Sequence, residues 1–193
     1  MMGFFRRGGE RRRVIAGLHA AVTAAARRPG LYTELGVPDT VEGRFESLCL
    51  HVYLVLRRLD RLPPPAPEVA QEFVDSVFAE LDASLRELGV SDMGVGKRMK
   101  KLGAAFYGRA AGYDAALKAP GDEALRQALA RNILGAAAAA QGGDLEAAAL
   151  AVYVRAAEVE LARADLETLL ASGPPFPDPG AFAGAAVSED RPA

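Results

Sequence analysis

The stretch LRELGVSDMGVGKRMKKLGAAFYGRAAGYDAAL, residues 85–117, is the part of the sequence that decides the fold class. It begins with the end of one helix. Gly89 then stands where a left-handed residue terminates a helix, and Ser91 and Asp92 can cap the next one. Beyond this hinge, apolar side chains recur at steps of three and four residues, which predicts a helix with one apolar face. They are Met99, Leu102, Phe106, Ala110, Tyr113 and Leu117.

The opposite face of this helix carries only small residues. Two positions along a helix correspond to about 200° of rotation, and this relation places Ala104, Gly108, Ala111 and Ala115 there. A glycine in a helix interior costs about 1 kcal/mol relative to alanine, so Gly103, Gly108 and Gly112 in the middle of this helix need a structural reason. We expect the helix to have neighbours on both sides. Either it is a central core helix, or it keeps one face for a partner.

Helical spacing recurs along most of the chain, and no segment alternates convincingly at the two-residue period of a strand. We therefore predict an all-α fold, a single compact domain of about six helices over residues 13–171. Residues 1–12, a basic arm, and residues 172–193, a proline-rich acidic tail, are predicted to be disordered because they offer few core contacts. The expected helices cover, approximately, residues 14–27, 39–59, 68–88, 91–119, 122–134 and 144–171.

Residues 36–59, GVPDTVEGRFESLCLHVYLVLRRL, have an unbroken and wide apolar stripe, so the helix that they form is expected to be central. Together with the later helices, this segment resembles the ubiquinol–cytochrome c chaperone family, in a bacterial-type form. The resemblance spans residues 31–134. Its shared features are LHVYLVLRRL at 50–59, LRELGVSD at 85–92, the KRMKKL…YGR…YD run that starts at Lys97, and ALARNIL at 128–134.

The resemblance implies a non-enzymatic assembly chaperone that uses no cofactor and no metal. Members of this family assist assembly of cytochrome b into the respiratory bc complex. The resemblance leaves open whether a small co-chaperone subunit or the ribosome takes part. The sequence departs from the family pattern after Tyr113 and Asp114, where two alanines stand in place of Glu-Gly.

A chaperone for a membrane protein must offer an apolar groove with a polar rim, because its client exposes apolar helices before assembly. We expect this groove beside the helices at 39–59 and 91–119. Some of the candidates must be core residues instead, and we expect this of Phe45 and Phe106 first. The candidate walls are Phe45, Tyr53, Phe106 and Tyr113, and the candidate rim is Arg44, His51, Arg109 and Asp114.

A cluster of cations stands at the start of the helix at 91–119, with no acidic residue between Gly94 and Arg109. Cations at a helix N-terminus oppose the helix dipole, so a bound anion would explain them, although a solvated helix end would also account for the cluster. We predict that Lys97, Lys100 and Lys101 bind an anionic partner, whether a lipid headgroup, RNA or an acidic protein segment.

His51 is the natural candidate for chemistry, and it lies at the edge of the apolar stripe of its helix. We favour a boundary histidine bonded to a neighbouring carboxylate or carbonyl group. Contact with a client inside the groove and axial ligation of haem are the alternatives. Cys49 cannot form a nucleophile–base pair with it, because two positions apart on a helix the side chains diverge by about 200°.

Length, composition and charge limit where the protein can act and which other functions it can have. The chain has 193 residues, a single cysteine and a formal net charge of −2, and no segment approaches the 18 uninterrupted apolar residues of a membrane-spanning helix. We expect a cytoplasmic protein, with a peripheral place at the inner membrane left open. A helical nucleic-acid-binding regulator is a second candidate, but no helix-turn-helix pattern is evident, and we expect no DNA partner. A haem or small-molecule carrier that uses His51 is the third.

Overall fold

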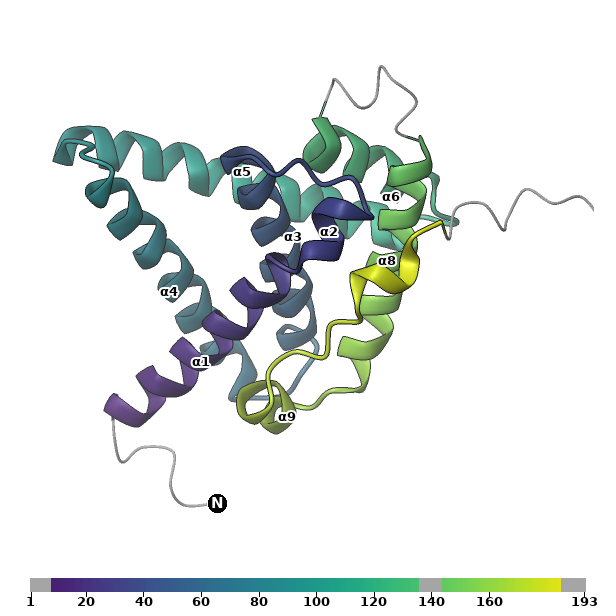
Figure 1. Ribbon diagram of the computed structural model, residues 1–193. Helices are drawn as coiled ribbons and strands as arrows, with labels where there is room; N and C mark the ends of the chain where they lie inside the picture. Colours follow the sequence, from purple (N-terminus) through teal and green to yellow (C-terminus); the bar gives the residue numbers. More distant parts are fainter. Residues whose placement is uncertain (1–7, 136–143, 185–193) are drawn as a thin grey trace, which may run out of the picture.

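The structure, a computed structural model, describes residues 8–135 and 144–184, and this part of the chain contains helices and no strand (Figure 1). The all-α prediction is confirmed. The helices are α1 (Gly8–Ala26), α2 (Pro29–Thr33), α3 (Val41–Leu59), α4 (Ala66–Glu87), α5 (Asp92–Lys118), α6 (Glu123–Leu129), the π-helical turn η1 (Ala130–Leu134), α8 (Asp144–Arg163), α9 (Leu166–Ala171) and the 3₁₀ turn η2 (Pro179–Phe182).

Helix α3 lies at the centre of the fold, as its apolar stripe predicts. It packs against α1, α4, α5, α8 and η1. Seven consecutive residues, Cys49–Val55, are buried, so the helix is enclosed on every side over two turns. The side chain of Thr40 caps it by accepting a hydrogen bond from the backbone N–H of Gly43. The first turn is less enclosed than the stripe predicts, because Val41 is exposed.

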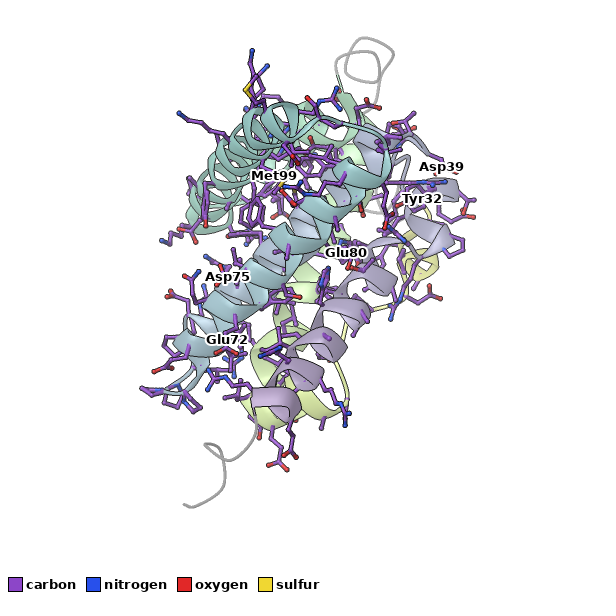
Figure 2. All side chains as sticks on the ribbon, turned by 90° about the vertical axis from the view of Figure 1, so that its left-hand side faces the viewer. Tyr32, Asp39, Glu72, Asp75, Glu80 and Met99 are labelled. Carbon is purple, nitrogen blue, oxygen red and sulfur yellow. The ribbon has the colours of Figure 1, made fainter. Side chains whose placement is uncertain are left out.

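Helices α4 and α5 form a V whose closed end is the Gly89 turn (Figure 1). Gly89 has a φ of +77°, the left-handed conformation that the sequence predicts. Ser91 occupies the N-cap position of α5, but its side chain makes no capping hydrogen bond. Met99, at the start of the apolar stripe, lies on the side of α5 that faces α4 (Figure 2).

The two faces of α5 differ as the sequence predicts. The sequence left open whether the small-residue face packs in the core or stays free for a partner. Phe106, Tyr113 and Leu117 of the apolar stripe are buried. Ala104, Gly108, Ala111 and Ala115 are all exposed, and a Cβ atom on Gly108 would meet nothing within 4 Å. This face is therefore exposed and is not packed in the core of the described chain.

The predicted helix at 144–171 is broken in two. Helix α8 ends at Arg163, and α9 begins after Asp165, whose carboxylate accepts a hydrogen bond from the backbone N–H of Thr168 at 2.8 Å. The Ala164 carbonyl, left without a helical partner by the break, accepts a hydrogen bond from Arg58 Nε of α3 at 2.8 Å. The break therefore turns the chain back toward α1, against which α9 packs.

Both predicted chain boundaries need correction. Helix α1 starts at Gly8, so the predicted basic arm is too long; residues 1–7 lie outside the described part. The predicted disordered tail is wrong for residues 172–184. Phe176 is buried, and Arg28 donates hydrogen bonds to the carbonyl groups of Phe176 and Pro177, both at 2.8 Å. A few apolar anchors and one arginine order a segment whose composition alone suggests disorder.

The close approach of α3 to the chain before it gives a stability prediction. A Cβ atom on Gly43 would lie 2.0 Å from the Pro38 carbonyl oxygen, whereas one on Gly108 would lie in open space. Gly43→Ala is expected to lower the free energy of unfolding by about 3 kcal/mol or more, and Gly108→Ala to raise it by up to about 1 kcal/mol. Chemical denaturation measures both. Equal effects of the two substitutions would contradict the packing at Gly43.

Candidate functional site

An open groove lies between α3, the first half of α4 and the second half of α5. The arms of the V are far apart at this position (Figure 1). It encloses about 1400 Å³ of space, including its open mouth. Its floor is formed by apolar side chains from all three helices. They are Tyr53 and Leu56 of α3, Ala70 and Val74 of α4, and Phe106, Tyr107, Ala110 and Ala111 of α5.

A second, small apolar pocket adjoins the groove deeper in the V. Val74 and Phe106 line both spaces. The remaining lining residues of the pocket belong to α3 and α4 and include Phe45, Val77 and Phe78. Phe78 packs edge-on against Phe106, with ring centroids 5.9 Å apart. The aromatic floor of the groove therefore rests on a second aromatic layer.

Charged residues form one end of the groove, and Arg57 holds them together. Its guanidinium bonds Asp114 of α5 and, through Nε at 3.0 Å, Glu158 of α8. Lys118 Nζ lies 2.6 Å from the other oxygen of Asp114. The Lys118 ammonium, followed by the Arg57 guanidinium, lowers the pKa of the Asp114 carboxyl. Because the Arg57 side chain is only 8% exposed, this network fixes α5 and α8 to the central helix.

The structure divides the predicted partner-binding residues among several places. Tyr53, Phe106 and Asp114 line the groove, and Phe45 lines the adjoining pocket. Phe106 is buried, as expected for a core residue, and so is Tyr53. Phe45, which was also expected in the core, is only half-buried.

The remaining predicted residues lie elsewhere. Arg44 is exposed and pairs with Asp39 at 2.7 Å, and Asp39 lies near Tyr32 in Figure 2. Arg44 does not line the groove. Lys97, Lys100 and Lys101 are exposed near the start of α5, at the closed end of the V. These side chains do not form one site with the groove.

Arg109, a candidate rim residue, forms a bidentate ion pair with Glu46 of α3. Burial raises the pKa of the Glu46 carboxyl, although Arg109 acts in the opposite direction. Burial, followed by the charge of Glu46, also raises the pKa of the Cys49 thiol to about 12. Cys49 therefore stays a thiol at neutral pH, and Arg109 serves to neutralise a carboxylate inside the fold.

The prediction that His51 and Tyr113 belong to the groove is wrong, because both side chains are fully buried. His51 Nδ1 lies 2.8 Å from the Ser47 carbonyl oxygen, which only accepts hydrogen bonds, so Nδ1 carries the proton. Nε2 then accepts a hydrogen bond from the Tyr153 hydroxyl at 2.8 Å. The Phe176 ring covers the imidazole, with centroids 4.8 Å apart. With both nitrogens engaged, His51 is not placed to bind haem or a client.

The described residues offer neither a metal site nor a membrane-spanning helix. No group of three or more histidine, cysteine, aspartate or glutamate side chains is arranged to hold a metal ion in residues 8–135 and 144–184. Over the same part of the chain, no helix is both long and apolar enough to cross a membrane.

Sequence reasoning missed several groove residues, among them Val74, Tyr107 and Arg57. Tyr107 lies outside the apolar stripe of α5 and is 60% exposed, so helical periodicity assigns it to solvent. Val74 belongs to α4, a helix that the sequence pattern did not connect with the groove. Arg57 lies within the LHVYLVLRRL segment, and that segment was the available signal.

The fold and the groove define a class: an all-α protein that presents an apolar surface, bordered by charges, between three helices. Comparison with known proteins makes the assignment specific. The sequence model described as "Ubiquinol-cytochrome C chaperone" matches residues 33–176. A search of the curated proteins gives no match. The fold is similar to the crystal structure of the Cbp3 homolog from Brucella abortus, with a TM-score of 0.75 and 39% sequence identity, over 91% of this chain and 95% of that one. The chain belongs to the ubiquinol–cytochrome c chaperone family.

The burial of His51 predicts an acid-sensitive fold. Burial lowers the pKa of His51 from 6.5 to about 4, so between these values the unfolded chain binds a proton that the folded chain does not. The contribution of neutral His51 to the unfolding free energy is complete above pH 6.5 and is lost as the pH falls toward 4. Within this window the unfolding free energy of the wild type should fall more steeply than that of His51→Gln, by up to about 1.4 kcal/mol per pH unit. Denaturation at several pH values measures both slopes, and parallel slopes would contradict a neutral, buried His51.

The Arg57 network gives a second stability prediction. Arg57→Met removes the charge that joins Asp114 to Glu158, and we expect a loss of about 2 kcal/mol of unfolding free energy, typical of hydrogen bonds to charged groups. Arg61→Met is the matched control, because Arg61 lies 3.6 Å from the same Glu158 but is 46% exposed; its effect should stay within about 0.5 kcal/mol. Equal losses in urea denaturation would show that Arg57 contributes no more than a surface pair.

Proposed function

We propose that this protein is a non-enzymatic assembly chaperone that binds newly made cytochrome b and promotes assembly of the ubiquinol–cytochrome c reductase complex. The observation that carries the proposal is the open apolar groove, found in a chain that belongs to the ubiquinol–cytochrome c chaperone family. A helix of an unassembled membrane protein has an apolar surface that needs cover, and a groove between helices is a common way to receive such a helix.

The lining of the groove supports a helical client. Tyr107 offers a large, exposed aromatic surface, and the small side chains Ala110 and Ala111 beside it allow the backbone of another helix to approach closely. The charged end, with Arg57, Asp114 and Lys118, provides polar partners for the end or flanking loop of such a helix. Apolar contacts would give affinity, and the charged end would give orientation.

We place the protein in the cytoplasm, next to the inner membrane in which its client is assembled. The two alternative functions have less support. A haem carrier needs an accessible ligand, whereas both nitrogens of His51 are engaged and its ring is buried. A nucleic-acid-binding regulator would leave the apolar groove without a role.

The experiment that tests the proposal compares two substitutions on the same helix. Deleting the gene should lower the amount of assembled bc complex and its quinol oxidation, while other respiratory complexes persist. In the deletion strain, Ala111→Leu should restore assembly poorly, because the larger side chain fills the groove. Capture of cytochrome b by the tagged variant should fall about tenfold, which corresponds to about 1.4 kcal/mol.

Ala104→Leu is the matched control. Ala104 is exposed on the same face of α5 but does not line the groove, so this variant should restore assembly and capture cytochrome b like the wild type. Circular dichroism should show that both variants fold. Normal cytochrome b levels in the deletion strain would refute the proposed function, and equal capture by the two variants would refute the groove as its site.

A further inference from the structure

The corner between α4 and α5, which comprises the end of α4, the Gly89 turn and the first turns of α5, has a surface that the groove does not explain. In Figure 1 it projects from the body at the end of the V far from α8. Two large apolar side chains lie exposed on it: Leu88 is 78% exposed and Met93 is 90% exposed. Neither residue lines the groove or the adjoining pocket. A single exposed apolar residue is ordinary, but two that lie close together in one corner, next to a charged patch, can form a contact surface.

A patch of four cations follows on α5: Lys97, Arg98, Lys100 and Lys101. All four are exposed, and none forms an ion pair with a residue that the structure describes. No acidic residue occurs between Met93 and Gly108. The nearby acids Asp82 and Asp92 are paired with Arg86, and Glu87 is the remaining acid of the corner. The patch therefore carries uncompensated positive charge.

Met93 and three of the four cations share one side of α5. At about 100° per residue, Met93, Lys97, Lys100 and Lys101 fall within an arc of about 100°. The buried side chains of Val95 and Phe106 project from the opposite side of the same helix. One flat object could therefore contact Met93 and the three lysines at the same time without disturbing the core.

We propose that the α4–α5 corner binds the surface of an anionic lipid bilayer. Leu88 and Met93 would enter the boundary between headgroups and acyl chains, and the cationic patch would contact lipid phosphates, as for interfacial amphipathic helices. A lipid surface accounts for both features of the corner. RNA accounts for the charge alone, because proteins that hold single strands stack bases on aromatic rings, and the exposed apolar residues here are leucine and methionine.

This inference goes beyond the proposed chaperone function and does not depend on it. The corner and the groove are close together, because Lys101 and Tyr107 are six residues apart on α5, a rise of about 9 Å along the helix axis. A corner bound to the bilayer would hold the groove within about two helical turns of the membrane surface. A groove in that position could receive a segment that is leaving or entering the bilayer.

Vesicle flotation with the full-length protein tests the proposal without any client. The wild type should bind vesicles that contain anionic phosphatidylglycerol and should not bind vesicles of phosphatidylcholine alone. Each lysine near an anionic surface contributes about 1 kcal/mol, so the Lys97→Gln, Lys100→Gln, Lys101→Gln variant should bind about a hundredfold more weakly. Leu88→Ser with Met93→Ser should also weaken binding, and high salt should weaken the wild type.

Matched controls come from the same chain. Replacing Arg12, Arg13 and Arg27 by Gln removes the same charge from exposed positions of α1 and its end, and Val41→Ser removes an apolar side chain that is exposed elsewhere. These controls should bind like the wild type. Equal loss in the arginine variant and the lysine variant would refute the corner as the site. A lysine variant that keeps vesicle binding but loses binding to an RNA oligonucleotide would show a nucleic-acid surface instead.

Tryptophan fluorescence gives an independent readout, because the chain contains no tryptophan. Met93→Trp should emit at shorter wavelength when anionic vesicles are added, since its side chain leaves water. Val41→Trp should show no such shift. An unshifted emission of the Met93→Trp variant on bound vesicles would overturn the insertion of the corner, whatever the result of the chaperone experiment.

Discussion

The burial of the middle of α3, Cys49–Val55, is the constraint on which the rest of the structure depends. Polar side chains at and beside this buried stretch must find hydrogen-bond partners on other elements. Ser47 donates a hydrogen bond to the Ala26 carbonyl at the end of α1, and Glu46 binds Arg109 of α5. His51 binds Tyr153 of α8, and Arg57 reaches both α5 and α8. These directional contacts help to fix which helices surround α3 and at what height along its axis each of them lies.

The V of α4 and α5 follows from this arrangement. The two helices meet at the Gly89 turn and both pack on α3, but the Arg57 and Arg109 ion pairs fix α5 across the central helix while α4 lies beside α1 (Figures 1 and 2). Their other ends must therefore separate. The separation leaves an apolar floor uncovered, an arrangement that a protein tolerates when a partner covers it. The ion pairs that stabilise the fold also place Asp114 and Arg57 at the end of the groove.

The other side of α3 is closed by the segment after α9. Phe176 covers His51, and Phe182 packs against Tyr153, with ring centroids 5.7 Å apart. Gly30 allows this approach, because a Cβ atom there would lie 2.9 Å from the backbone nitrogen of Gly180. The molecule thus has a closed side, where polar groups are buried and paired, and an open side, which carries the groove. Polar residues of α3 have different roles according to the side on which they lie.

The sequence by itself determined the helical class, the central place of α3, the left-handed turn at Gly89 and the apolar face of α5. Each of these follows from local spacing or from the conformation of one residue. The resemblance added the family, which the comparisons confirm. The sequence also placed Tyr53, Phe106 and Asp114 on helices that border the groove. Only the tertiary structure decided that His51 and Tyr113 are core residues, that Tyr107 and Val74 line the groove, and that residues 172–184 are ordered. These features depend on which helices meet, and the spacing within one helix shows its apolar side but not the neighbour that covers it.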